Sequence, residues 1–144
     1  MANTSRLKAT LKGEVSFPVY YEDTDFSEYV YHANYLKYFE RAREHLIGIQ
    51  SIKKLFDEGI HYVVGEIHVR FRAPARHADN VIIRSETVAT TSPLLIVKQD
   101  ALRRELSGKE TLLCSATVKI VAIGSDGHPI NIPDQYILEY MNVS

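Results

Sequence analysis

The segment that decides the fold is Asn34–Gln50, which reads NYLKYFERAREHLIGIQ. Its apolar residues recur at spacings of three and four, and charged residues fill the other side. This period is typical of an amphipathic helix with one buried stripe. The side chain of Asn34 can accept a hydrogen bond from a helix N–H, so we expect it to be the N-cap. The predicted stripe comprises Leu36, Phe39, Ala42, Leu46 and Ile49.

Most of the remaining chain is predicted to form strands. A short helix over Ile52–Glu58 is expected to end at Gly59, and another is predicted over Pro133–Tyr140. Pro18 lacks a backbone donor, which favours an edge position for the first strand. One central helix among consecutive strands indicates an α+β fold, in which the concave face of an antiparallel sheet buries the helix. The predicted strands are Glu14–Tyr21, Tyr62–Phe71, Asp79–Thr90, Leu94–Arg104 and Leu112–Ala122.

Length and composition indicate one ordinary globular domain. The 144 residues are expected to form a single domain over 1–144, in which residues 1–13 are a flexible or edge segment. The net charge of −1 argues against a protein whose main role is to bind nucleic acid or an anionic membrane. No apolar run approaches the roughly 20 residues of a membrane helix, and no signal-peptide pattern opens the chain. We therefore expect a cytoplasmic protein without an integral membrane segment.

The chemistry-bearing residues gather between the first strand and the long helix. Glu22, Asp23 and Asp25 fall within four residues, and His32 lies seven residues after Asp25. A carboxylate beside a helix N-terminus can act as a base or nucleophile on a carbonyl, and the free helix N–H groups can hold an oxyanion. The same residue types also favour caps and Asx-turns, so a purely structural role stays open.

A metal site is the weaker interpretation of these residues. Glu22, Asp23, Asp25 and His32 could bind a cation, but no EF-hand or His-Glu-x-x-His spacing is present. Cys114 is the only cysteine, which also disfavours a disulfide or a cysteine-ligated zinc. His61 and His68 sit seven apart on a predicted strand, and this odd spacing predicts opposite faces. We expect neither a metal nor another cofactor.

One basic run, Arg70–His77, could recognise a phosphate-bearing ligand. Its guanidinium groups at Arg70, Arg72 and Arg76 are suited to phosphate oxygens. A solvated strand end followed by a turn explains the same run equally well. No Gly-rich phosphate loop and no Gly-x-Ser-x-Gly motif is present.

Three blocks together resemble a known family. YEDTD at 21–25, VYHANY at 30–35 and FERAR at 39–43, with FRAPAR at 71–76, are similar to the hotdog-fold acyl-CoA thioesterases. The resemblance covers roughly residues 14–135 and is strongest to the 4-hydroxybenzoyl-CoA thioesterase type, in particular the Tol-Pal-associated branch. It implies a long helix wrapped by a curved sheet, homodimers joined edge to edge, and often homotetramers.

The resemblance also implies an activity and its residues. Acyl-CoA would be the substrate and would bind between subunits, with no cofactor. Asp25 matches the catalytic carboxylate, and His32 matches the position beside the thioester. Tyr31 and Ala33, together with His32, would supply amides that polarise the carbonyl, and Asn34 would help to position the substrate. The possible CoA contacts remain Arg70, Arg72 and Arg76.

One departure and two rival functions accompany this expectation. Many relatives carry a glycine shortly after the second aspartate, where this chain has Ser27 and Glu28. Glycine permits a positive φ or close approach of a ligand, so we expect this departure to change the shape or charge of the pocket mouth. A hotdog enoyl-thioester hydratase is one rival, although its shorter Asp-to-His spacing and Asn-Pro dipeptide are not matched here. A non-catalytic acyl-ligand sensor or assembly module is the other rival, and it would not need a reactive Asp25.

Overall fold

The structure is a computed structural model, and it describes residues 11–88 and 93–132. The predicted helix at Pro133–Tyr140 and most of the predicted N-terminal segment lie outside these ranges. Lys12 and Gly13, the last residues of that segment, belong to the first strand, which is an edge of the sheet, and pair with Glu86 and Ser85. Within the described ranges, no helix combines the length and apolarity needed to cross a membrane.

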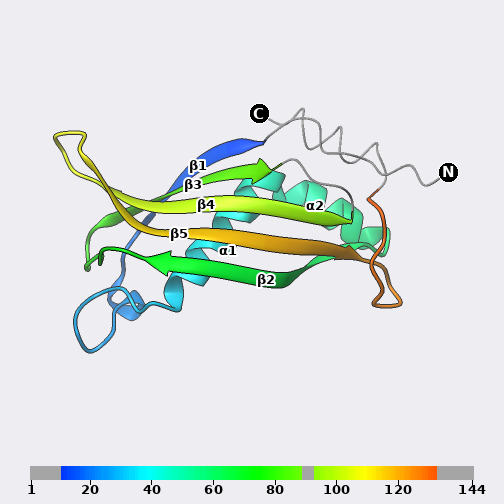
Figure 1. Cartoon of the computed structure of the whole chain (residues 1–144), viewed down its shortest axis with the longest axis horizontal. Helices are drawn as coiled ribbons and strands as arrows, with labels where there is room; N and C mark the ends of the chain where they lie inside the picture. The colour runs from blue at the N-terminus through cyan, green and yellow to red at the C-terminus, as the bar shows by residue number, and fades with distance from the viewer. Residues whose placement is uncertain (1–10, 89–92, 133–144) are drawn as a thin grey trace.

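A five-stranded antiparallel sheet lies in front of two helices (Figure 1). The strand order is β1-β3-β4-β5-β2, so β1 and β2 are the two edges. Pro18 ends edge strand β1, as its missing donor predicts. This arrangement confirms the predicted α+β fold. The strands are β1 (Lys12–Pro18), β2 (His61–Phe71), β3 (Asn80–Val88), β4 (Leu94–Arg104) and β5 (Glu110–Ile123), and the helices are the 3-10 turn η1 (Tyr21–Asp23), α1 (Asn34–Ile47) and α2 (Ile49–Asp57).

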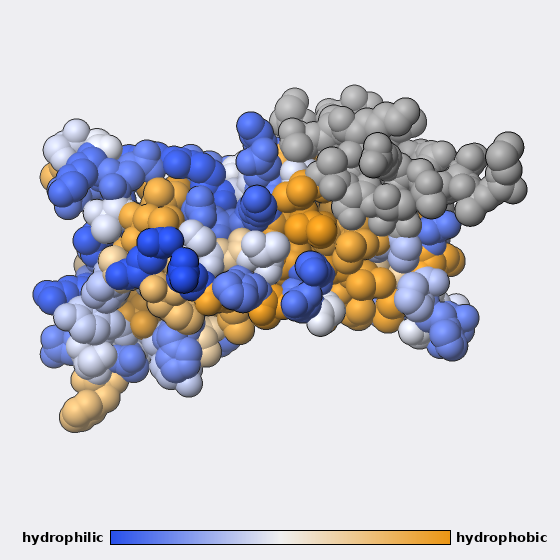
Figure 2. All heavy atoms as spheres, viewed as in Figure 1, coloured by the Kyte–Doolittle hydropathy of each residue, from blue (hydrophilic) through white to orange (hydrophobic). Residues whose placement is uncertain are grey.

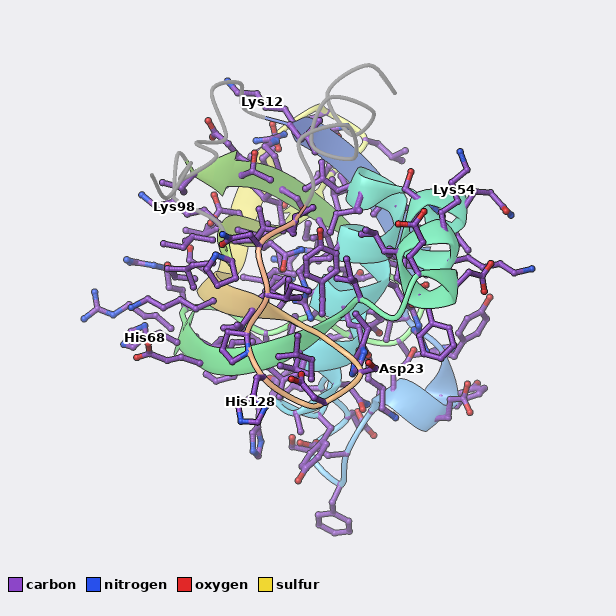
Figure 3. The ribbon with its side chains drawn as sticks, turned by 90° about the vertical axis from the view of Figure 1, so that its right-hand side faces the viewer. Lys12, Asp23, Lys54, His68, Lys98 and His128 are labelled. Atoms are coloured by element: carbon purple, nitrogen blue, oxygen red, sulfur yellow. The ribbon has the colours of Figure 1, made fainter. Side chains whose placement is uncertain are left out.

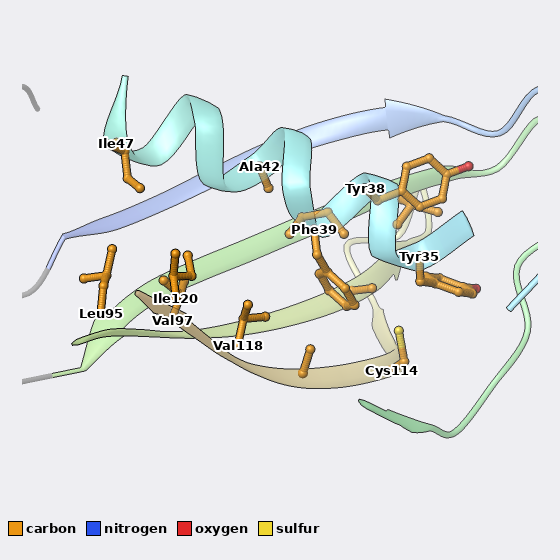
Figure 4. Packing of buried hydrophobic residues seen from close by; sticks show 14 of the residues in the cluster. Tyr35, Tyr38, Phe39, Ala42, Ile47, Leu95, Val97, Cys114, Val118 and Ile120 are labelled. Carbon is orange, nitrogen blue, oxygen red and sulfur yellow. The ribbon is translucent and has the colours of Figure 1, made fainter. Parts of the chain in front are cut away.

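Helix α1 buries its apolar stripe on the inner face of the sheet (Figure 4). Phe39 and Ala42 are in the core as predicted, but Leu36 and Ile49 are exposed. The buried side is rotated toward the two tyrosines Tyr35 and Tyr38, whose large rings remove more apolar area from water than Leu36 would. The alternating sheet residues that cover the stripe include Leu95, Val97, Cys114, Val118 and Ile120.

Both ends of α1 differ from the prediction. Gly48 ends the helix with φ of 99°, a conformation that glycine adopts without strain because it has no Cβ. Its N–H donates to the Glu44 carbonyl over 2.8 Å. The predicted end at Gln50 is therefore wrong, and the next helix starts at Ile49. At the other end the N-cap is Ala33, and Asn34 is the first helical residue.

A polar network crosses the core between α1 and the sheet. Arg43 is 7% exposed and donates from a terminal nitrogen to Gln99 Oε1 over 2.9 Å. Gln99 in turn donates to the Phe39 carbonyl and to Ser85 Oγ, each over 2.9 Å. Burial lowers the pKa of the Arg43 guanidinium. These bonds hold the helix at one position on the sheet, because each buried polar group depends on the others.

Strand β2 contains a β-bulge at Gly65, between Val64 and Glu66. The extra residue shifts the alternation by one. Although the bulge gives His61 and His68 an even spacing in the register, His61 packs against Phe56 of α2 and lines a cavity on the helix side, whereas His68 lines the outer face with Arg84. These contacts agree with the predicted opposite facing of the two histidines. In Figure 3, His68 projects from the side of the sheet turned away from the helices.

The outer face of the sheet is divided into two parts (Figure 2). One part is hydrophilic and includes an ion-pair network in which Arg84 and Arg104 bind Glu14 and Glu110. The other part is hydrophobic. The surface pairs of the network are solvent-exposed, so they contribute little to stability.

Candidate active site

Asp25 lies at the start of a tight turn between η1 and α1. A bridge between Thr24 and Val30 closes the loop, and the Asp25 N–H donates to the Tyr29 carbonyl over 2.8 Å. The Glu28 N–H donates back to the Asp25 carbonyl over 3.0 Å. Glu28 has φ of 72°, a left-handed conformation that favours glycine. The sequence departure at Ser27 and Glu28 therefore falls on the turn that carries Asp25.

The Asp25 carboxylate is exposed and held by Ser27. Ser27 donates to Asp25 Oδ1 from its hydroxyl, over 2.5 Å, and from its N–H, over 2.8 Å. These bonds, the hydroxyl first, lower the pKa of the Asp25 carboxyl, and the Tyr29 amide and His32 act in the same direction. The carboxyl is therefore ionised at neutral pH, as a nucleophile or general base requires.

The loop is fastened to the start of α1 through the Asp23 backbone. The Asp23 carbonyl accepts hydrogen bonds from the Tyr31 N–H over 2.8 Å and from Asn34 Nδ2 over 2.9 Å. The side chain of Asp23 accepts from the Tyr20 N–H over 2.9 Å. The amide of Asn34 thus binds the loop two residues before Asp25, and the expected N-cap role is wrong because Ala33 holds that position. A part of Asn34 in positioning the substrate stays a prediction.

His32 lies between aromatic rings at the first turn of the helix. Its ring centroid is 4.6 Å from that of Tyr31 and 6.1 Å from that of Phe71, with Phe71 edge-on. Phe71 is the last residue of β2, so the edge strand reaches the site. The electrostatic effect of His32 on Asp25 places these two predicted residues in one neighbourhood.

Some backbone N–H groups just before α1 donate hydrogen bonds and others do not. The Tyr31 N–H binds the Asp23 carbonyl, and the Asn34 N–H binds the Tyr31 carbonyl over 2.8 Å. Among the described residues, no hydrogen bond occupies the N–H groups of His32 and Ala33. The N–H groups of His32 and Ala33 are therefore available at the helix start, whereas the Tyr31 amide is already used.

The three arginines of the basic run do not converge. Arg70 lines the outer face of the sheet with His68 and Lys98. Arg76 lies beside the Asp25 turn, where its guanidinium is 5.2 Å from the Tyr29 ring centre and donates to the Tyr29 hydroxyl over 3.3 Å. A Tyr29–Arg76 bridge joins the same two segments through the backbone. Arg72 is exposed at the end of β2.

Burial keeps two other potential nucleophiles near the site, the Tyr35 hydroxyl and the Cys114 thiol, in their neutral forms. Burial raises the pKa of the Tyr35 hydroxyl to about 12 and the pKa of the Cys114 thiol to about 12. Both groups are therefore neutral at physiological pH, and a neutral thiol is a poor nucleophile. Within the described ranges, no three His, Cys, Asp or Glu side chains form a group that could hold a metal ion.

A cavity of about 170 Å³ lies between the C-terminal half of α1 and the start of β2. Its walls combine the apolar Ile47 and Val64 with the buried Arg43, and Glu40 and Glu44 also line it. A cavity of roughly 150 Å³ is large enough to hold benzene, so this space has the size of a ring or a short acyl chain. The cavity and Asp25 lie near opposite ends of α1 in one chain.

Sequence reasoning missed two contributors to this site. Ser27 was noted only as a replacement for glycine, although the Asp-x-Ser spacing is a signal for a side chain that binds the carboxylate two residues before it. Phe71 was assigned to a strand, and nothing local indicates that this strand ends beside His32.

Comparison with known proteins decides the family. The profile of the thioesterase-like superfamily matches residues 19–137, which is more than half of the chain. The chain belongs to this superfamily. The acyl-CoA thioester hydrolase YbgC of Escherichia coli O6:H1 is 36% identical over 107 residues, which are 73% of this chain and 77% of that protein. The expected family, the hotdog acyl-CoA thioesterases, is thereby confirmed.

Solved structures of thioesterases agree with this assignment. A probable thioesterase from Bartonella henselae is 28% identical, with a TM-score of 0.74 over 85% of this thioesterase and 99% of that chain. The 4-hydroxybenzoyl-CoA thioesterase from Pseudomonas sp. strain CBS-3 is 17% identical, with a TM-score of 0.78 over 90% of this chain and 98% of that chain. At this low identity, the similarity to the 4-hydroxybenzoyl-CoA thioesterase shows that the two proteins share a fold.

Proposed function

We propose that this thioesterase hydrolyses acyl-CoA to free CoA and a carboxylic acid, with Asp25 as the reactive carboxylate. One observation carries this proposal: an exposed, ionised carboxylate stands beside a helix start at which two amides are unengaged. Acyl transfer needs a nucleophile or base, and it needs donors for the developing oxyanion. Asp25 supplies the first, and the N–H groups of His32 and Ala33 supply the second.

Asp25 can act in either of two ways. As nucleophile, its carboxylate attacks the thioester carbon, the CoA thiolate leaves, and water then hydrolyses the resulting anhydride. As general base, it takes a proton from a water molecule that attacks the same carbon. In both routes His32 orients the thioester or the water. A single turnover in ¹⁸O-labelled water tests the first route: label in the Asp25 carboxylate shows an anhydride that water opened at the Asp25 carbonyl, because the general-base route never places water oxygen there.

The proposed assembly is a homodimer through the free edge of β2. Among the described residues, β2 pairs on one side only, with β5. Along this edge Val64 is 50% and Phe71 50% exposed, and Phe56 of the preceding helix is 64% exposed. Such an apolar edge favours pairing with another strand. A cytoplasmic location and a homotetramer remain predictions of the sequence.

Dimerisation would complete the active site. If two β2 edges pair antiparallel about a two-fold axis, the Phe71 end of one strand meets the His61 end of the other. The first end adjoins His32, and the second end lines the cavity between α1 and β2. The acyl group of a thioester held at Asp25 could therefore enter the cavity of the partner.

Recognition of CoA by arginine is proposed for the side of the molecule that carries Asp25. Arg76 lies there, bonded to Tyr29 of the Asp25 turn, whereas Arg70 lines the outer face of the sheet. Reversing the charge at all three positions tests the whole predicted set. We expect a higher KM for CoA esters, and an unchanged KM would remove these residues from the site.

The activity is tested by thiol release on a panel of short, long and aromatic acyl-CoA esters. The proposed function predicts release of free CoA in amounts equal to the acid formed. Hydration of an enoyl-CoA without thiol release would instead favour the hydratase. Tight binding of acyl-CoA without turnover, unchanged by Asp25→Asn, would favour the non-catalytic module.

A further inference from the structure

The carboxylate of Asp25 is held asymmetrically. Both hydrogen bonds from Ser27, from its hydroxyl and from its N–H, end on Oδ1. Neither bond reaches Oδ2. The Asp25 backbone is fixed separately, since its N–H binds the Tyr29 carbonyl and its carbonyl accepts from the Glu28 N–H. The side chain of Ser27 is therefore not needed to close the turn, and its hydroxyl acts on the carboxylate.

We infer that Ser27 is a positioning residue of the proposed reaction, which fixes Asp25 through Oδ1 and presents Oδ2 to the substrate or water. This inference rests on the proposed role of Asp25. A carboxylate with one oxygen held by two donors keeps one rotamer, which favours a reactive geometry for the other oxygen. The same donors stabilise the ionised form and thereby lower its pKa.

The neighbouring charges do not replace this effect. His32, at the start of α1, favours the ionised carboxyl more weakly than Ser27 does. Glu28 follows in the same turn and is exposed. From the segment between β2 and β3, the guanidinium of Arg76 is bonded to the Tyr29 hydroxyl. Ser27 is therefore the residue whose removal should most change the titration of Asp25.

The test compares Ser27→Ala and Ser27→Thr with the wild-type enzyme. The titration of the Asp25 carboxyl is followed by carbon NMR, and the acid limb of kcat/KM is measured on one acyl-CoA ester. Loss of the hydroxyl raises the pKa, so Ser27→Ala should move both the titration and the acid limb to higher pH. Ser27→Thr keeps a hydroxyl and should return both toward the wild-type positions. Ser107→Ala, in an exposed turn far along the chain, is the matched control and should move neither.

The outcomes separate this inference from the proposed function. If Ser27→Ala leaves either the titration or the acid limb unchanged, while Asp25→Asn abolishes hydrolysis, the inference on Ser27 is wrong and the function stands. If Asp25→Asn retains full hydrolysis, the proposed role of Asp25 fails, and the positioning role of Ser27 fails with it. A shift of both quantities in Ser27→Ala, reversed in Ser27→Thr, supports the inference.

Discussion

Asn34 Nδ2 donates to the Asp23 carbonyl over 2.9 Å, so the first residue of α1 is bonded to the loop that carries Asp25. The Tyr31 N–H shares the same acceptor over 2.8 Å. Through this carbonyl the helix start and the proposed nucleophile are held as one unit. The distance between the Asp25 carboxylate and the free amides of His32 and Ala33 therefore depends on Asn34.

Replacing Asn34 should impair hydrolysis more than folding. Asn34→Ala removes the side-chain donor but leaves the Tyr31 amide on the Asp23 carbonyl, so the loop is loosened without being released. Because small displacements of catalytic groups are costly, we expect kcat to fall by about tenfold or more. Steady-state kinetics with an acyl-CoA ester measure this effect. Asn80→Ala, at an exposed position of β3, should retain wild-type kcat. Equal kcat values for the two variants would contradict the role of Asn34.

Removing the buried amide of Gln99 should destabilise the fold. Gln99→Ala takes away the acceptor of the buried Arg43 and two further hydrogen bonds. A buried charge that loses its partner is strongly destabilising, so we expect the free energy of unfolding to fall by about 3 kcal/mol. Urea denaturation measures it. The adjacent Lys98→Ala, on the exposed outer face, should change it by about 0.5 kcal/mol or less. Similar values for both variants would show that the network does not stabilise the protein.

Replacing the left-handed residue of the Asp25 turn, Glu28, by glycine should stabilise the protein. Glu28 has φ of 72°, and a non-glycine residue in this conformation costs about 1–2 kcal/mol. Glu28→Gly should therefore raise the free energy of unfolding by about 1 kcal/mol, part of the relief being offset by the greater entropy of glycine in the unfolded chain. Glu28→Ala, which keeps a Cβ, should not raise it. Thermal unfolding of the two variants gives the comparison, and equal melting temperatures would show that φ at this position carries no strain.

The free edge of β2 should control the oligomeric state. A charge placed among the apolar side chains of this edge would have to be buried in the proposed dimer, which is unfavourable. We expect Val64→Lys to convert a dimer into a monomer with reduced hydrolysis. Ser16→Lys, on the opposite edge strand β1, should remain dimeric. Light scattering coupled to size exclusion gives the masses. A dimer that persists in Val64→Lys but not in Ser16→Lys would place the interface on β1 instead.

Local patterns predicted the elements of the fold well, because their causes are local. The period of Phe39 and Ala42 indicated the helix, and alternation through β5 indicated its longest strand. Errors arose where tertiary packing decides. Leu36 fits the apolar period, but Tyr35 and Tyr38 bury more area and turn the helix toward themselves. The bulge at Gly65 also shifts the alternation along β2, and no local pattern marks the extra residue.

The candidate site was predictable in part for the same reason. Asp25 and His32 are close in sequence, so the short loop between them indicated a shared neighbourhood. Arg70, Arg72 and Arg76 are also close in sequence, but the end of β2 falls between them and sends Arg70 to the outer face. The approach of Phe71 to His32 depends on the strand order, which the sequence pattern does not specify.

The central claim concerns one carboxylate, and Asp25→Asn tests it most directly. Asparagine has nearly the same shape and can still accept both bonds from Ser27, so the turn and the assembly should be preserved. With equal melting temperature and mass, thiol release from acyl-CoA should fall by about 100-fold or more, because the reacting anion is gone. A loss smaller than about tenfold, or 1.4 kcal/mol of activation free energy, would contradict the role assigned to Asp25.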